Sequence, residues 1–219
     1  MPPYQILIKN NIAAAAARGH MRYMKSDVKN RILVNGRPEY ITLSLKHDSD
    51  FKDVNQRHLA DDWETYKWKL SRKIIANYKQ APYFEDVLPV MDCFLCTNDN
   101  LFGFILNSLY VIKRYLEIET PLIRSSIIDI DHSRRGKDKV LAICKALGAD
   151  RYINPIGGVE LYDRQEFYNQ DIDLLFLKSD LPEYKQFGAE FVSALSILDV
   201  MMFNRVETVQ QMLSQYLFV

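Results

Sequence analysis

The sequence predicts an α/β fold, in which a small, mostly parallel sheet is packed by helices, with an N-terminal β-hairpin and a helical middle segment. Two observations predict this class. Asn35-Gly36 separates two short apolar runs, and this dipeptide is the strongest local signal for a hairpin. Apolar stretches with strand and helix spacing then alternate along residues 122–177, which is typical of right-handed crossovers between parallel strands.

The composition is that of an ordinary globular protein without a strong overall charge. Acidic and basic residues number 28 each, so no chain-wide field favours nucleic acid or an anionic membrane as a partner. No apolar run approaches the ~20 residues that span a bilayer, so we expect no membrane insertion. Three cysteines favour a reducing compartment over a disulfide scaffold, and we expect a cytoplasmic protein.

Residues 1–21 do not fit the pattern of the rest. They combine an alanine run with Gly19-His20-Met21, a tripeptide that is common at cloning junctions. The segment is therefore either a divergent native N-terminus or a non-native one. We expect a single α/β domain over residues 22–219, with no internal repeat.

The hairpin and three helices make up the first half of the chain. Residues 40–45 alternate between polar and apolar, so one face of the second hairpin strand should be buried. Apolar residues at steps of three and four along 63–78 predict a long helix whose lysine-rich face is either solvated or anion-binding, the former being favoured. Pro82 begins a second helix that Pro89 bends or ends. A third helix follows at 101–116, with Asn98 as its expected cap.

Cys93 and Cys96 have the spacing of a metal knuckle or a redox pair. A structural zinc site takes about four ligands, and the chain offers no second cysteine pair. We therefore expect two buried thiols and no metal site.

The second half predicts the sheet and the helices that cover it. Strands are expected at 122–127, 151–153 and 171–177. A helix at 137–147 should end at Gly148 in the left-handed conformation. After the second strand the chain turns at Gly157-Gly158, and Asp163 is expected to cap a short helix at 165–168. The last two predicted helices cover 194–203 and 206–217.

The loop before the helix at 137–147 has the composition of an anion-binding site. Arg134, Arg135 and Lys137 supply three cations, and Gly136 leaves space beside the free amides that begin the helix. A solvated basic loop is the competing interpretation. The ligand that such a site takes is a nucleotide sugar or another phosphorylated small molecule. The sequence leaves both the cofactor and the oligomeric state open.

His132 lies in the same loop and is the candidate general base, with Asp129 or Asp131 to orient it. Ser125 and Ser126 end the preceding predicted strand, where they would meet His132, although no nucleophile elbow surrounds them. A loop histidine without a catalytic part is the competing interpretation.

Four further residues complete the candidate site. Gly157 and Gly158 let the backbone approach a ligand closely, with Glu160 and Tyr162 available to sugar hydroxyls; the alternative is a plain tight turn.

Asp199 is a further candidate. It interrupts an apolar helix and is either a working acid or a buried group with a structural role. Because an unpaired buried charge costs several kcal/mol, we expect Asp199 to contact a backbone amide, a tyrosine or a basic side chain.

Several spaced segments resemble the WbqC-like family, in order, from Asn30 to the C-terminus. They are NRILVNGRPEYITLSL, NYKQAPYF, Ser125-Ser126, GKDKVLAICKALGADRYINPIGGVELYD and YKQFGAEFVSALSILDVMMFN. The resemblance implies a bacterial cytoplasmic protein from surface-polysaccharide (O-antigen) gene clusters. It also implies a glycine transferase, which places an aminoacyl group on an amino sugar.

The chain departs from the family's pattern at its front. Members begin with a Gln-Pro-Tyr segment and reach an aspartate-bearing strand, whereas only Pro3-Tyr4 correspond here and the aspartates are missing. If those aspartates are catalytic, this chain is inactive. Two functions therefore stay open: transfer of a glycyl or acyl group to a nucleotide-linked amino sugar, and non-catalytic binding of a sugar nucleotide or a partner.

Overall fold

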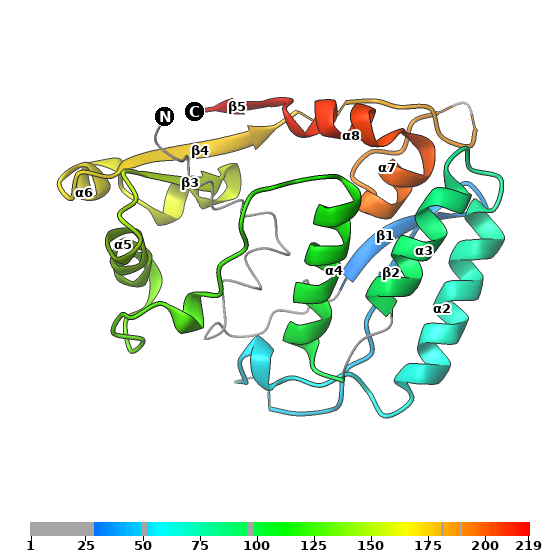
Figure 1. Cartoon of the computed structure of the whole chain (residues 1–219), viewed down its shortest axis with the longest axis horizontal. Helices are drawn as coiled ribbons and strands as arrows, with labels where there is room; N and C mark the ends of the chain where they lie inside the picture. The colour runs from blue at the N-terminus through cyan, green and yellow to red at the C-terminus, as the bar shows by residue number, and fades with distance from the viewer. Residues whose placement is uncertain (1–28, 50–51, 96–98, 181, 189) are drawn as a thin grey trace. The chain divides into compact units, whose positions relative to one another are not determined.

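Figure 1 shows the computed structural model, which describes residues 29–49, 52–95, 99–180, 182–188 and 190–219. The described residues form two compact units. The first unit holds residues 120–180 and 216–219, and the second unit holds residues 29–119 and 182–215. The predicted α/β class is confirmed, while a single domain over residues 22–219 stays a prediction.

The predicted hairpin opens the second unit. Strands β1 (Lys29–Val34) and β2 (Arg37–Thr42) pair antiparallel, with Val34 opposite Arg37. The two-residue turn between them has positive φ at both Asn35 (50°) and Gly36 (74°), the backbone shape that this dipeptide favours. β1 buries Ile32 and Leu33, whereas β2 stays mostly exposed. The hairpin therefore contributes to the core through side chains of β1.

The helices of the middle segment lie close to their predicted bounds. They are α2 (Trp63–Tyr78), α3 (Phe84–Leu95) and α4 (Leu101–Tyr115), after the short 3-10 helix η2 (Val54–Gln56). Pro89 lies inside α3 and does not end it. Asn100 caps α4, since its side chain accepts a hydrogen bond from the Gly103 N–H at 3.1 Å. The predicted cap, Asn98, lies outside the described residues.

The expectation of two buried thiols is wrong for Cys93. Its side chain is exposed on α3, because the apolar side chains of that helix direct the opposite face into the core. The buried residues of that face include Val87, Met91 and Phe94. Cys96 lies outside the described residues.

The first unit holds a three-stranded mixed sheet in the order β3-β4-β5. β3 (Arg151–Pro155) pairs parallel with β4 (Asp173–Ser179), and β4 pairs antiparallel with β5 (Tyr216–Phe218). The antiparallel pairing extends one residue further, where Phe176 and Val219 exchange backbone hydrogen bonds of 3.1 and 3.0 Å. The sheet is therefore completed from the far end of the chain.

Two expectations about the sheet are corrected. Residues 122–127 form no strand but pass into the 3-10 helix η3 (Ser125–Ile127). The last helix, α8 (Val206–Leu213), ends before the predicted position 217, and β5 replaces its expected end. Both errors concern short apolar segments, whose state depends on whether a distant strand is available to pair with them.

Helix α5 (Gly136–Ala146) leads into β3 through the expected glycine cap. Gly148 has φ +61°, its N–H bonds the Lys145 carbonyl at 3.1 Å, and the Ala149 N–H bonds the Cys144 carbonyl at 2.8 Å. This is the Schellman pattern of helix ends. It turns the chain so that Cys144 packs in a core with residues of β3, of β4 and of α6 (Arg164–Tyr168).

The remaining helix, α7 (Ile197–Phe203), begins three residues later than predicted. Ser196 caps it by accepting a hydrogen bond from the Leu198 N–H at 3.3 Å. The Ser196 N–H in turn donates to the Arg31 carbonyl of β1 at 2.7 Å, which ties the start of α7 to the hairpin. In the described part of the chain, no helix is long and apolar enough to cross a membrane.

Candidate functional site

The predicted anion loop is ordered by Asp131. Its Oδ1 accepts hydrogen bonds from the Ser133 N–H (3.0 Å) and the Ser133 hydroxyl (2.6 Å), and its Oδ2 lies 3.7 Å from Arg134 Nε. The bond from the Ser133 hydroxyl is the main cause that lowers the pKa of the Asp131 carboxyl. The carboxylate thus shapes the turn and also offsets the charge of Arg134.

Arg135 has a different environment from Arg134. It is the N-cap of α5, in extended backbone (φ −133°, ψ 163°), and it supplies no side-chain cap to the helix. The exposed guanidinium forms no ion pair with any residue that the structure describes. Gly136 follows with φ +53°, and no atom lies within 4 Å of the position that a Cβ would take. The backbone is therefore accessible on the Cβ side of Gly136, and Arg135 gives the first amides of α5 no side-chain cap.

Lys137 is already engaged. Its ammonium pairs with Glu166 of α6, and this hydrogen bond is the main cause that raises the pKa of Lys137. Two of the three predicted cations, Arg134 and Lys137, thus have carboxylate partners, and Arg135 is the cation left for a ligand.

His132 is held by the backbone of its own loop. Its Nε2 lies 3.0 Å from the Ile128 carbonyl oxygen. Because a carbonyl only accepts, Nε2 carries a hydrogen, and in the neutral ring the basic nitrogen is then Nδ1. Nδ1 is buried. Asp131 was one of two carboxylates expected to orient His132, but its side chain binds Ser133.

The two candidate serines do not stand at the end of a sheet strand. They begin η3, where Ser125 is buried and Ser126 is exposed. The prediction that both lie at the carboxyl edge of the sheet is therefore wrong, because the segment before them forms no strand.

The two glycines after β3 have different surroundings in the 3-10 helix η4 (Ile156–Leu161). A Cβ on Gly158 would stand 1.7 Å from Asn154 Nδ2, whereas one on Gly157 would meet nothing within 4 Å. The Asn154 amide is fixed in turn, since its Oδ1 accepts a hydrogen bond from the Tyr152 hydroxyl at 3.2 Å. Gly158 is therefore packed closely against Asn154, whereas the space beside Gly157 is unoccupied.

Glu160 and Tyr162 also differ in their exposure. Glu160 is exposed on η4, where its carboxylate is accessible to a ligand. The Tyr162 ring packs edge-on against Tyr152 and Phe167, with centroid distances of 5.9 and 5.7 Å. Its aromatic face therefore belongs to the core of the first unit.

Asp199 lies in the second unit and is fully buried. Its Oδ2 accepts a hydrogen bond from the Tyr78 hydroxyl at 2.7 Å, and its Oδ1 accepts from the Tyr184 hydroxyl (2.6 Å) and the Gln186 amide (3.1 Å). Burial raises the pKa of the Asp199 carboxyl, against the effect of these three donors. The expected tyrosine partner is confirmed, and the arrangement favours the structural role that the sequence left open.

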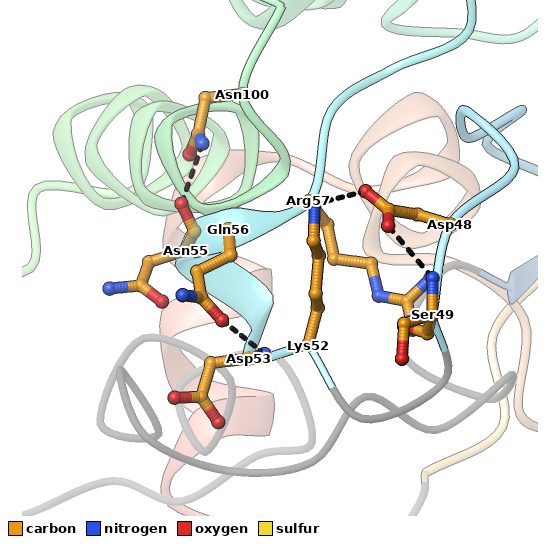
Figure 2. Close-up of polar contacts among 8 residues, drawn as sticks. All are labelled: Asp48, Ser49, Lys52, Asp53, Asn55, Gln56, Arg57 and Asn100. Atoms are coloured by element: carbon orange, nitrogen blue, oxygen red, sulfur yellow. Dashed lines mark hydrogen bonds and ion pairs between the residues drawn. The ribbon is translucent and has the colours of Figure 1, made fainter.

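The sequence missed a polar cluster in the loop before α2 (Figure 2). Arg57 is buried there, and its Nη2 donates to the Ser49 carbonyl at 2.8 Å. The Asp53 N–H donates to Gln56 Oε1 at 3.1 Å, and the cap residue Asn100 donates to a carbonyl of η2 at 2.8 Å. The three-residue spacing of Asp53 and Gln56 is a capping-box signal, so this turn is visible in the sequence itself. The cluster orders the loop and the start of α4.

No metal centre is formed by the described residues, since no three His, Cys, Asp or Glu side chains gather there as ligands. A hollow of about 260 Å³ lies in the second unit, between the hairpin turn and the end of α2. It holds none of the predicted site residues.

Comparison with known proteins gave one result. A family model described as the WbqC-like protein family matches residues 17–211 of the 219-residue chain. A search of curated proteins and a search of solved structures found no match.

Proposed function

The chain belongs to the WbqC-like protein family, and on that premise we propose that it acts in bacterial surface-polysaccharide (O-antigen) biosynthesis. Its reaction there is transfer of a glycyl or other acyl group to the amine of a nucleotide-linked amino sugar. The observation that carries the proposal is the start of α5, where the N-cap residue Arg135 has no carboxylate partner among the described residues and the Cβ side of Gly136 is unoccupied.

This arrangement suits a phosphate of the nucleotide. Amides at a helix N-terminus donate toward an anion, and the helix dipole favours negative charge there. Arg135 can bind two phosphate oxygens through its planar guanidinium. Lys137, which directly follows Gly136 and is kept cationic by Glu166, adds positive charge nearby without being free itself. The phosphate-binding role therefore rests on Arg135 and the amides at Gly136 and beyond.

The transfer itself needs one base. The amine nitrogen of the sugar attacks the carbonyl carbon of an activated acyl donor. The amine gives up one proton, and the donor's leaving group departs with the electrons of the broken bond. His132 Nδ1 is the candidate that accepts the proton, with Gly157 and Glu160 as the open positions for the acyl oxygen and the sugar hydroxyls.

The matched variants Arg135→Ala and Arg134→Ala test the binding half of the proposal. Titration with a nucleotide-linked amino sugar should show about a tenfold or greater loss of affinity for Arg135→Ala, because a hydrogen bond to a charged group contributes about 1.5–3 kcal/mol. Arg134→Ala should lose less, since Asp131 already offsets its charge. Equal losses, or no loss in either variant, contradict the assignment.

A non-catalytic module that binds a sugar nucleotide or a biosynthetic partner is the second candidate function. One observation favours it: Nδ1 of His132 and the side chain of Ser125 are both buried, and a group that reacts with substrate needs access. Incubation of an amino-sugar nucleotide with activated glycyl and acyl donors, followed by mass spectrometry, separates the two. A mass increase equal to the acyl group supports transfer, and binding without that increase supports the module.

A further inference from the structure

The hollow in the second unit has no part in the function proposed above. It measures about 260 Å³ and lies where the hairpin turn meets the carboxyl end of α2. At the right of Figure 1, the upper end of α2 lies beside the tip of the hairpin. The Asn35 N–H donates to the Asn77 side-chain oxygen at 2.8 Å, and this bond fixes one wall of the hollow against the other.

Hydrogen-bond acceptors stand at the helix end. Carbonyls of the last helical turn point beyond the helix and lack backbone donors unless a cap supplies them. In α2 the carbonyl of Ile75 accepts from Lys79 and that of Tyr78 accepts from Ala81. Ala76 and Asn77 are two of the residues that line the hollow, and their carbonyls accept no hydrogen bond from the described part of the chain.

Hydrogen-bond donors surround the same space. Asn35, Lys79 and Gln80 line the hollow, and none of these three side chains is bonded to another described residue. The Asn77 amide differs, because its Nδ2 donates to the Lys73 carbonyl at 2.8 Å and its oxygen is held by Asn35. Asn77 therefore builds the wall, while the other three side chains are free to bind.

The apolar part of the lining is Leu33 and Phe187. Leu33 is buried in β1. The Phe187 ring is fixed by Phe203, edge-on at a centroid distance of 4.7 Å, and by Tyr78 at 6.5 Å. A rigid apolar surface next to carbonyls and amides suits a molecule with C–H groups on one side and hydroxyls on its edge.

We propose that this hollow binds one monosaccharide unit. The hydroxyl donors of the sugar bond the Ala76 and Asn77 carbonyls, its oxygens accept from Asn35, Lys79 and Gln80, and its C–H face rests on Phe187 and Leu33. The volume lies below the roughly 300–1,000 Å³ of pockets for larger ligands, so a whole nucleotide sugar is excluded. The negative end of the α2 dipole disfavours a phosphate, which leaves a neutral sugar.

Amide NMR of the full-length protein tests the site, with methyl glycosides of glucose, galactose and N-acetylglucosamine as probes. At least one glycoside at tens of millimolar should shift the amide signals of Asn35, Gly36, Lys79 and Gln80. Gln80→Ala and Asn35→Gly should each weaken the response about two- to tenfold, as expected for one lost hydrogen bond. Asn35→Gly keeps the positive φ of the turn, so the hairpin should remain folded.

Lys69→Ala is the matched control, because Lys69 is exposed on the same helix outside the hollow. It should leave the titration unchanged. The proposal is overturned if no glycoside shifts these signals, if glycerol shifts them equally, or if the double variant of Asn35 and Gln80 binds as the wild type does. Shifts confined to Gly136 and its neighbours also overturn it, while leaving the function proposed for α5 intact. Conversely, if a nucleotide sugar fails to shift the amide signal of Gly136, the function proposed for α5 is contradicted and the sugar site in the hollow is unaffected.

Discussion

The hydroxyl of Tyr78 donates a 2.7 Å hydrogen bond to Asp199, across 121 residues of sequence. The same hydroxyl accepts a 2.8 Å bond from the Leu33 N–H. One tyrosine on α2 therefore links strand β1 to the buried carboxylate of α7. Burial raises the pKa of the Tyr78 and Tyr184 hydroxyls, and the nearby carboxylate raises it further, so both remain protonated donors.

Tyr78→Phe should lower the free energy of unfolding by about 1–3 kcal/mol, since it leaves a buried carboxylate oxygen and a buried N–H without a partner. Urea unfolding followed by circular dichroism measures the change. Tyr184→Phe should cost less, because it removes a donor to Asp199 without stranding a backbone group. Tyr110→Phe, on an exposed side chain, should be neutral. A Tyr78→Phe protein as stable as the Tyr110→Phe protein contradicts the assignment.

The raised pKa of Asp199 makes a prediction about pH. The folded state holds the proton more tightly than the unfolded chain, where the pKa is near its ordinary value of 3.8. The stability from this group is therefore fully present below that value and is lost as pH rises through the folded pKa. The unfolding free energy of wild type minus that of Asp199→Asn should fall as pH rises above about 4. A difference that instead grows with pH would show that the three donors outweigh burial.

Thiol labelling should distinguish the cysteines of the two units. Burial raises the pKa of Cys144 to about 11, so only about a thousandth of it is thiolate at about pH 8. In the Cys93→Ser/Cys96→Ser protein, Cys144 should resist a disulfide reagent until denaturant is added. In the Cys96→Ser/Cys144→Ser protein, the exposed Cys93 should react in the native state. Comparable native rates would contradict the burial of Cys144.

Alanine at the two loop glycines should give opposite results. Gly158→Ala forces the Asn154 amide to move and should destabilise by about 1–3 kcal/mol, the range for an overpacked site. Gly157→Ala should be neutral or stabilising by about 0.4–1 kcal/mol, because its Cβ meets open space and the unfolded chain loses freedom. Thermal melting of the two variants checks the pair. Equal melting temperatures would mean that the loop repacks around Asn154 at no cost.

Local signals predicted local structure well. Asn35-Gly36 fixed the hairpin turn, Gly148 ended α5, and Asp163 caps α6 by accepting a hydrogen bond from the Gln165 N–H at 2.7 Å. Each depends on the conformational preference of one or two residues. The pairing of β5 could not be predicted in this way, because its spacing also fits a helix and its partner β4 lies far back in the chain.

The same limit applies to the candidate site. The composition of the loop at 131–137 indicated three cations, but it could not show that Glu166 engages Lys137 or that Asp131 turns toward Ser133 and Arg134. Pairing among charged residues depends on which helices pack together. For Asp199, chemistry required a partner, while the choice of Tyr78 and Tyr184 came from the tertiary fold.

In the described part of the chain, each unit is built from two separated stretches, and this interleaving constrains how the protein can be made. During synthesis, the core around Tyr78 cannot close until residue 199 has left the ribosome, and β4 lacks a neighbour until residues 216–218 follow. Both cores therefore mature late, with apolar strands exposed in the meantime, a condition in which chaperones bind nascent chains. For the same reason, a contiguous fragment that contains all described residues of one unit also contains residues of the other, and any truncation has to respect both stretches of a unit.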